Sequence, residues 1–284
     1  MSQRVGIIGV GLLGGALGQR LAKQGWEVLG LDPAVPLLDG MTMCENGSDL
    51  VSQCETILLS LPTSDIAVKV IETLGQVLTE KHCFIDTTTG KPSEMETLGQ
   101  TLSRRGVEYI EANVAGSSEL AKRGEAALFL GGTDETINRC RPLLQALTSK
   151  RFHVGSVGAA SRFKLVHNLI LGLNRVALAE GLAFAEAIGF NAAEALGILR
   201  ETPATSKALE AKGEKMTKGK YYPPQARLGQ HLKDVRLIRR LADEFGAITP
   251  MSDTHQSILE KANLLGLGEA DNAAVIEALR SRNL

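Results

Sequence analysis

Lys164 and Asn168 form the pair whose residue types and spacing point most directly to chemistry. They stand four residues apart in a segment whose apolar pattern predicts a helix, so both side chains would lie on one face. An asparagine amide can hold the oxygen of an alcohol or carbonyl while a lysine amine exchanges a proton with it. Gly172 extends this face with a minimal side chain, which would leave room for a flat ring. The pair therefore predicts acid/base catalysis on an alcohol/carbonyl couple.

A glycine-rich segment near the N-terminus has the spacing of a dinucleotide-binding turn. Residues 9–14 read G-x-G-x-x-G, between an apolar run that predicts a strand and a pattern that predicts a helix. Gly9 permits the tight turn, Gly11 lets the backbone approach the pyrophosphate, and Gly14 lets helix and strand pack closely. The phosphates would lie at the helix N-terminus, which favours anions. The expected cofactor contacts are Gly9, Gly11, Leu12, Leu13 and Gly14.

Asp32 predicts which dinucleotide binds. It closes the second expected strand, at 27–31, and the residues after it are Pro33, Ala34 and Val35 rather than an arginine. A carboxylate there accepts hydrogen bonds from the ribose hydroxyls and repels a 2′-phosphate, which favours NAD over NADP. Because oxidised nicotinamide is cationic, it would disfavour the ammonium form of Lys164 and let that lysine act as a neutral base.

Two further strand ends are expected to line the cofactor. Leu61 and Pro62 lie where the strand expected at 56–61 ends, and Thr89 follows the strand expected at 83–87. In open α/β sheets, ligands bind beyond the carboxyl ends of the strands. The threonines at 87–89 would equally cap the helix that starts near Pro92, and this alternative stays open.

The elements that must position these residues divide the chain in two. Short apolar runs alternate with helical patterns up to residue 157, which predicts a mainly parallel, doubly wound Rossmann-type sheet. Strands are expected at 5–9, 27–31, 56–61, 83–87, 107–111, 126–131 and 151–154, and helices near 12–24, 64–78, 92–105 and 134–147. The fold class is therefore α/β, with 1–157 as the NAD-binding domain and 158–284 as an all-α domain for substrate binding and dimerisation.

The second half predicts helices joined by one longer loop. The helical patterns lie near 158–188, 191–201, 224–245, 250–265 and 271–282, and the Lys-, Gly- and Pro-rich segment 212–224 predicts the loop. Segment 158–188 is apolar almost all round, so it should be buried on most sides, crossing between domains or into a second subunit. Two helices with a break near Gly172 or Gly181 are the alternative. We expect a homodimer or homotetramer.

Composition excludes several other classes. The 284 residues are 44% hydrophobic and 22% charged with a net charge of −1, which is typical of a globular protein and of neither a nucleic-acid-binding nor a membrane protein. The four cysteines have no C-x-x-C spacing, so we expect reduced thiols and no metal site. No secretory signal precedes the first apolar run, and the expected location is the cytoplasm.

With these residues in place, the chain resembles the β-hydroxyacid dehydrogenase family, which includes 3-hydroxyisobutyrate dehydrogenase, 2-hydroxy-3-oxopropionate reductase and 6-phosphogluconate dehydrogenase. The resemblance is carried by 9–14, 111–118, 155–168 and 233–234 in the right order. Segment 155–168 looks like the family's glycine-spaced K-x-x-x-N motif, which implies Lys164 as general acid/base and Asn168 beside it. The resemblance implies hydride transfer between NAD and a small β-hydroxy acid or its semialdehyde. It also implies that Lys233 closes over the bound cofactor or substrate, and that His167, as in 6-phosphogluconate dehydrogenase, contacts substrate.

The substrate loop departs from the family pattern. Where the family has D-A-P-V-S-G-G, this chain has E-A-N-V-A-G-S over 111–117, so Ala115 replaces the serine and Ser117 the last glycine. In the family this stretch binds the substrate carboxylate through backbone N–H groups and the serine hydroxyl. Gly116 is retained, and Ser117 or Ser118 would supply the missing hydroxyl. An anionic substrate is therefore expected at Ala115, Gly116, Ser117 and Ser118.

Three other functions share part of this pattern. An imine reductase has the same architecture, but Lys164 and Asp32 count against it. A phosphogluconate dehydrogenase is favoured by His167, yet the chain lacks the long C-terminal extension of many such enzymes. A non-catalytic protein that binds or senses NAD would not need both Lys164 and Asn168.

Overall fold

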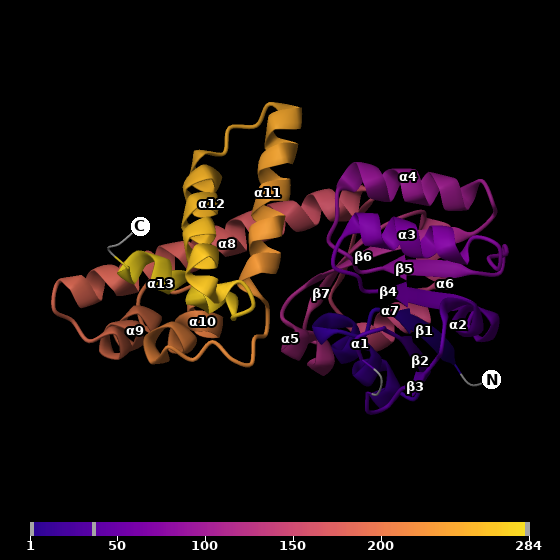
Figure 1. The fold of residues 1–284 in the computed structure, drawn as a ribbon, viewed down its shortest axis with the longest axis horizontal. Helices are drawn as coiled ribbons and strands as arrows, with labels where there is room; N and C mark the ends of the chain where they lie inside the picture. The colour runs from indigo at the N-terminus through magenta and orange to yellow at the C-terminus, as the bar shows by residue number, and fades with distance from the viewer. Residues whose placement is uncertain (1–2, 36–37, 282–284) are drawn as a thin grey trace. The chain divides into compact units, whose positions relative to one another are not determined.

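The computed structural model describes residues 3–35 and 38–281, and the chain forms two compact units, 1–164 and 165–284 (Figure 1). The first unit is built on one sheet and the second is helical. The expected α/β class, with a doubly wound sheet followed by a helical part, is confirmed.

The sheet of the first unit has the order β3-β2-β1-β4-β5-β6-β7-β8 and is parallel except for the β6–β7 pair. The strands are β1 (Arg4–Ile8), β2 (Glu27–Leu31), β3 (Thr42–Met43), β4 (Thr56–Leu59), β5 (Cys83–Asp86), β6 (Glu108–Ala115), β7 (Ala127–Gly131) and β8 (Arg151–Gly155). The helices are α1 (Leu12–Lys23), α2 (Gly47–Gln53), α3 (Ser64–Leu74), α4 (Pro92–Ser103), α5 (Ser118–Arg123), α6 (Asp134–Arg139) and α7 (Arg141–Leu147).

Two apolar cores lie on the two faces of this sheet. Successive strand residues alternate between them: Ile7 packs in a cluster with Leu17 and Leu21 of α1, and Ile8 in a cluster with Leu98 and residues of α2 to α4. Helices therefore cover both faces, which is why the strands are apolar runs rather than alternating patterns.

The register aligns the strand ends that were expected to bind the cofactor. Leu31, Ile8, Leu59, Asp86 and Glu111 form one row across β2, β1, β4, β5 and β6. The residues that follow β1, β2, β4 and β5 then emerge at the same edge of the sheet, whereas β6 continues beyond this row to Ala115. This row brings together segments that are far apart in the sequence.

The sequence missed some elements of the first unit. All seven expected strands are present, but β3 and the short helices α2 and α5 were not expected, and β6 extends to Ala115 rather than ending at Glu111. The helix expected at 134–147 is two helices that meet at Cys140. Pro142 lies in the first turn of the second one, where its missing N–H is tolerated.

The second unit is a set of packed helices. They are α8 (Ala159–Ala187, which begins in the first unit), α9 (Ala192–Arg200), α10 (Lys207–Lys218), α11 (Leu228–Phe245), α12 (Pro250–Ala262) and α13 (Val275–Arg280), with short turns η1 (Asn263–Leu267) and η2 (Asn272–Ala274) before α13. The loop expected at 212–224 was wrong for its first half, because α10 ends only at Lys218. Leu209 and Met216 are buried on one face of α10, and Gly219 caps its end with φ +62°.

α8 is one uninterrupted helix, as expected, and the alternative of two helices with a break near Gly172 or Gly181 is not what the structure has. The expectation that it is buried on most sides was wrong for this chain alone. Val166, Ile170 and Phe184 are 51%, 56% and 63% exposed.

α8 is also the one described helix long and apolar enough to span a membrane, with mean hydropathy 1.2. A core helix passes the same test, and the polar side chains of Lys164, Asn168 and Arg175 on α8 are buried within the protein.

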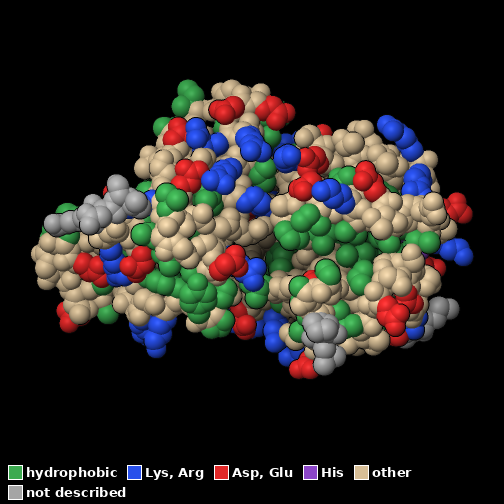
Figure 2. All heavy atoms as spheres, in the orientation of Figure 1, with side chains coloured by type: hydrophobic (Ala, Val, Ile, Leu, Met, Phe, Trp, Pro, Cys, Tyr) green, Lys and Arg blue, Asp and Glu red, His purple; other side chains and the backbone are tan. Residues whose placement is uncertain are grey.

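The surface carries charges of both signs. Figure 2 shows lysine and arginine side chains interspersed with aspartate and glutamate over the visible face. No broad area of a single sign stands out on that face.

Candidate active site

The glycine turn between β1 and α1 has the backbone that its spacing predicts. Gly9 has φ +90°, and a Cβ there would lie 2.4 Å from the Ser60 carbonyl oxygen. A Cβ on Gly14 would lie 1.8 Å from the Gly9 oxygen, so only glycine allows this contact. At Gly11 nothing lies within 4 Å of a Cβ position. The space beside Gly11, at the N-cap of α1, fits the pyrophosphate of a dinucleotide.

Asp32 is held against this turn. Its Oδ2 accepts a hydrogen bond from the Val10 N–H at 2.9 Å, and its Oδ1 accepts one from the Ala34 N–H at 2.8 Å. The first of these bonds directs the carboxylate toward the glycine turn, and each oxygen keeps a further lone pair. The carboxylate can therefore also accept hydrogen bonds from ribose hydroxyls.

The ends of β4 and β5 are joined by hydrogen bonds. The Leu61 N–H donates to Thr88 Oγ1 at 3.2 Å, and the Thr87 hydroxyl donates to the Leu59 carbonyl at 2.8 Å. Lys91 is the N-cap of α4 and has no side-chain cap bond, so the alternative that Thr87–Thr89 cap this helix is not what the structure has. Thr89 is half-buried and Pro62 exposed at the edge where the cofactor is expected.

Two buried carboxyl groups, which the sequence analysis did not assign to the site, organise the same edge. Burial raises the pKa of Asp86 to about 6 and that of Glu111 to about 7, against the hydrogen bonds that each accepts. Asp86 accepts from the Tyr109 hydroxyl at 2.9 Å. Glu111 accepts from the N–H groups of Gly158 at 2.6 Å and Ser161 at 3.2 Å. The available signal for Asp86 was an acidic residue at the end of the otherwise apolar strand β5, whereas Glu111 lies inside β6.

The side chain of Lys164, a residue of α8, reaches the end of β6. It is 8% exposed, and its Nζ donates a hydrogen bond to the Val114 carbonyl oxygen at 2.6 Å. The loop expected to bind substrate follows directly. In that loop a Cβ on Gly116 would lie 2.9 Å from the Ala126 Cβ, and Ser117 Oγ accepts from the Leu120 N–H at 3.3 Å. The structure thus brings the amine of Lys164 to the strand that carries Ala115.

In the second unit, the side chain of Asn168 is held by a hydrogen bond to an aspartate. Asn168 Nδ2 donates to Asp234 Oδ2 at 2.9 Å, and the other oxygen of Asp234 pairs with Lys233 Nζ at 3.2 Å. Asp234, which lies in the segment 233–234 that carries part of the resemblance, therefore contacts two expected site residues. His167, which directly precedes Asn168 on α8, is half-buried.

The face of α8 beyond Asn168 is not open. A Cβ on Gly172 would lie 2.6 Å from both His231 Nε2 and His255 Cε1. Two imidazole rings of the protein therefore occupy the space expected to admit a flat ring of the cofactor.

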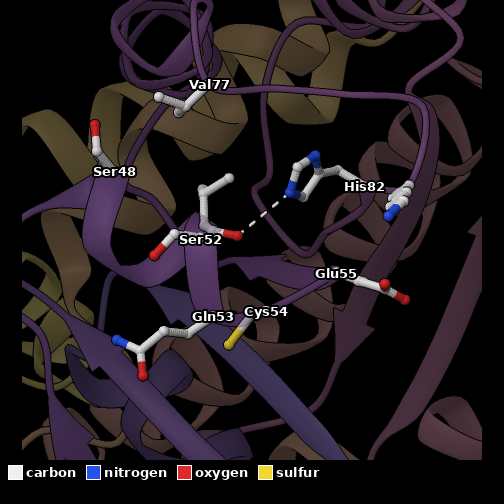
Figure 3. Close-up of a pocket in the computed structure, with 9 residues that line it drawn as sticks. Ser48, Ser52, Gln53, Cys54, Glu55, Val77 and His82 are labelled. Carbon is white, nitrogen blue, oxygen red and sulfur yellow. Dashed lines mark hydrogen bonds between the residues drawn. The ribbon is translucent and has the colours of Figure 1, made fainter.

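A depression in the first unit lies elsewhere. It measures about 380 Å³ and is lined by residues around Cys54 and His82, before the N-terminal ends of β4 and β5 (Figure 3). His82 Nε2 is 3.3 Å from the Val51 carbonyl oxygen, and burial raises the pKa of Cys54 to about 12. An inert thiol at the edge of the sheet opposite the glycine turn does not make an active site.

Both parts of the chain match known families. Residues 4–155 match the NAD binding domain of 6-phosphogluconate dehydrogenase, and residues 158–279 match the NAD-binding domain described for NADP-dependent 3-hydroxyisobutyrate dehydrogenase. Glyoxylate/succinic semialdehyde reductase 1 of Arabidopsis thaliana is 29% identical over 97% of this chain and 98% of its own length. 2-(Hydroxymethyl)glutarate dehydrogenase of Eubacterium barkeri is 28% identical over 97% and 94%. The solved structure of Mycobacterium tuberculosis 3-hydroxyisobutyrate dehydrogenase with L-serine has the same fold, with TM-score 0.85, 22% identity and coverage of 99% and 100%.

Proposed function

The chain belongs to the β-hydroxyacid dehydrogenase family and is an NAD(P)-dependent hydroxyacid dehydrogenase. From this premise we propose that it uses NAD and acts on a small β-hydroxy acid or its semialdehyde. We propose further that Lys164 is the general acid/base. The observation that carries the proposal is the buried Lys164 Nζ beside the Val114 carbonyl, at the start of the substrate loop. A lysine in this place is close to a bound carboxylic acid yet shielded from bulk water.

Each residue would have one task. A bound nicotinamide dinucleotide would accept or donate the hydride. Lys164 Nζ would take the hydroxyl proton when the alcohol is oxidised and return it when the carbonyl is reduced. The Asn168 amide, oriented by Asp234, would hold the substrate oxygen. Backbone N–H groups around Gly116, with the hydroxyl of Ser117 or Ser118, would hold the carboxylate.

The preference for NAD is supported by Asp32. Its carboxylate is directed toward the glycine turn by Val10 and lies where a 2′-phosphate would meet negative charge. No arginine or lysine follows it among residues 33–35 to receive that phosphate. The match to a model described for an NADP-dependent enzyme makes the direct comparison of NADH and NADPH essential.

The substrate class is supported by the relatives. One is named for glyoxylate and succinic semialdehyde and the other for 2-(hydroxymethyl)glutarate, all of which carry a carboxylate. The test is a spectrophotometric assay with NADH or NAD against a panel of semialdehydes and β-hydroxy acids. The proposal predicts turnover with at least one carboxylate-bearing member and none with cyclic imines. Turnover of imines alone would transfer the assignment to imine reduction.

We also propose that two or more copies associate through α8. Its exposed apolar side chains, Val166, Ile170 and Phe184 among them, are left uncovered by this chain. Burying such residues removes apolar surface from water and favours association.

A further inference from the structure

Arg175 is a buried cation whose hydrogen-bonding groups are not used. It lies on α8 in the second unit and is 5% exposed, and its Nε and Nη1 atoms are buried without a hydrogen-bond partner. Burial lowers the pKa of Arg175 to about 10, so the guanidinium stays charged at neutral pH. Among the residues that the structure describes, no side chain forms an ion pair or hydrogen bond with these two atoms. A buried charge with unused donors is costly, so something must offset it.

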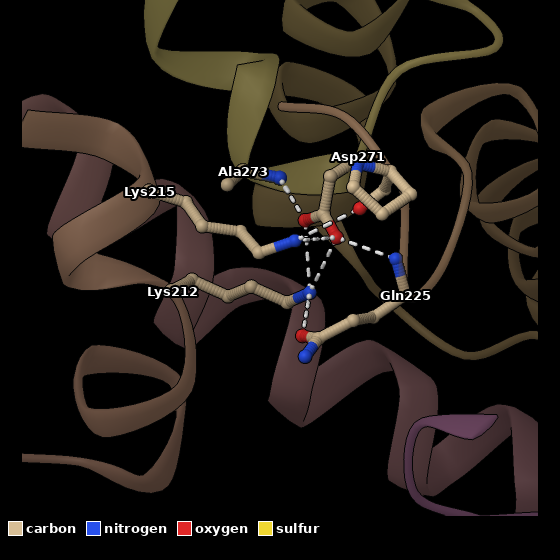
Figure 4. A network of polar contacts seen from close by, with 6 residues as sticks. Lys212, Lys215, Gln225, Asp271 and Ala273 are labelled. Carbon is tan, nitrogen blue, oxygen red and sulfur yellow. Dashed lines mark hydrogen bonds and ion pairs between the residues drawn. The ribbon is translucent and has the colours of Figure 1, made fainter. Parts of the chain in front are cut away.

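The neighbouring carboxylate of Asp271 attracts this charge but is not hydrogen-bonded to it, and its acceptor positions are taken by other donors. Figure 4 shows Asp271 inside a network with Lys212, Lys215 and Gln225. Its oxygens accept from Lys212 Nζ at 2.8 and 3.0 Å, Lys215 Nζ at 2.9 Å, the Gln225 N–H at 2.9 Å and the Ala273 N–H at 3.1 Å. Although burial opposes it, the charge of Lys212 and these bonds lower the pKa of Asp271 to about 2. Three cationic side chains therefore share one saturated carboxylate.

A second unused group faces the same place. His255 of α12 is 2% exposed, and its Nε2 has no hydrogen-bond partner. Burial and then the charge of Arg175 lower the pKa of His255 to about 4, so its ring is neutral and acts as a donor or an acceptor. The His255 ring packs 5.1 Å from that of His231 on α11, and both lie against Gly172.

We propose that the junction of α8, α11 and α12 binds a small monovalent anion, a halide or a carboxylate group, between Arg175 and His255. Arg175 would donate to such an anion from Nε or Nη1, and His255 Nε2–H would add a further donor. Bound water could satisfy the donors but would leave the excess positive charge. The two imidazoles beside Gly172 limit the ligand to a small one. This inference stands apart from the proposed dehydrogenase activity.

Thermal unfolding of the full chain at constant ionic strength tests the site. Tm is measured first in a buffer whose anion is a bulky sulfonate, such as MOPS. It is then measured again with bromide or formate in place of that anion. At ten times the dissociation constant, binding to the folded state alone raises Tm by about 3 °C. Arg175→Met should abolish this rise, and Arg240→Met, which removes an exposed arginine of α11, should keep it. An equal rise in wild type and Arg175→Met, or no rise in wild type, overturns the proposal.

Crystals of the wild type soaked in bromide give a second test that needs no variant. An anomalous peak within hydrogen-bond distance of Arg175 Nε supports the site, and replacement of that peak by formate density in a formate soak identifies the shared ligand chemistry. Water alone at the guanidinium, or a carboxylate side chain of a second copy there, overturns the proposal.

Discussion

Lys164 Nζ donates a hydrogen bond to the Val114 carbonyl oxygen at 2.6 Å, which ties the candidate acid/base to the strand that leads into the substrate loop. Lys164→Ala should therefore lower turnover by at least about 10²-fold, the lower end of a general acid/base contribution. NADH binding, measured by fluorescence, should remain nearly unchanged because the glycine turn and Asp32 are untouched. Lys69→Ala, at an exposed lysine of the same unit, is the control. Wild-type turnover in Lys164→Ala would remove the assignment.

The direction of the reaction should respond to pH through the same amine. Alcohol oxidation should speed up as pH rises, since the neutral amine accepts the proton, and carbonyl reduction should prefer lower pH, since the ammonium donates it. Initial rates in both directions between pH 6 and about 10 measure this. Identical profiles for the two directions would argue against a single group serving both.

Asn168→Ala should slow both directions without moving either pH profile, because an amide orients the oxygen and does not titrate. The loss of one donor to a reacting oxygen corresponds to roughly 10²-fold in kcat. Asn174→Ala, at an exposed asparagine of the same helix, should leave the rates unchanged. A shifted pH profile in Asn168→Ala would show that Asn168 acts instead through the charge of a neighbour.

NAD should bind more tightly than NADP because of Asp32. The ribose hydrogen bonds and the repelled phosphate together are worth on the order of 2–4 kcal/mol, a difference of roughly 30- to 1,000-fold in Kd. Titrating NADH and NADPH into the protein measures it, and Asp32→Ser should narrow the ratio mainly by weakening NADH. Equal or tighter binding of NADPH to the wild type contradicts the prediction.

Glu111 should make the protein less stable as pH rises from about 4.5 to about 7. Its folded pKa is raised by burial, so the folded state binds more protons than the unfolded state within that window, and the free energy of unfolding falls as the group ionises. The contribution is on the order of 3 kcal/mol. Glu111→Gln should flatten this part of the stability profile in urea unfolding, whereas Glu119→Gln, at an exposed position, should not. Parallel profiles for wild type and Glu111→Gln would contradict the prediction.

Light scattering at micromolar concentration should give at least twice the chain mass of 30.3 kDa. Ile170→Glu, which charges an exposed apolar position of α8, should weaken the association, and Gln100→Glu, at an exposed position of α4, should not. A monomeric wild type would leave the exposed apolar side chains of α8 without the role proposed for them.

The sequence by itself determined the features that depend on short spacings. In the G-x-G-x-x-G turn, Gly9 adopts φ +90° and a Cβ on Gly14 would meet the Gly9 oxygen, both of which are local requirements. The strands and most helices follow from the periodicity of apolar residues in short segments. The four-residue spacing of Lys164 and Asn168 places both on α8 regardless of the rest of the fold. α10 was missed because its lysines and glycine resemble a loop, and the partner that buries Lys212 is Asp271, far along the chain.

Only the tertiary structure decided which distant groups meet. The parallel register places Asp86 beside Glu111, and the start of α8 returns to Glu111 through Gly158 and Ser161. Asp234 reaches Asn168 across α11 and α8, and Arg175 is left without a free carboxylate. A buried polar group needs a hydrogen-bond partner, and that partner is often a residue far away in the sequence. No local sequence pattern specifies which distant residue the fold will bring to it.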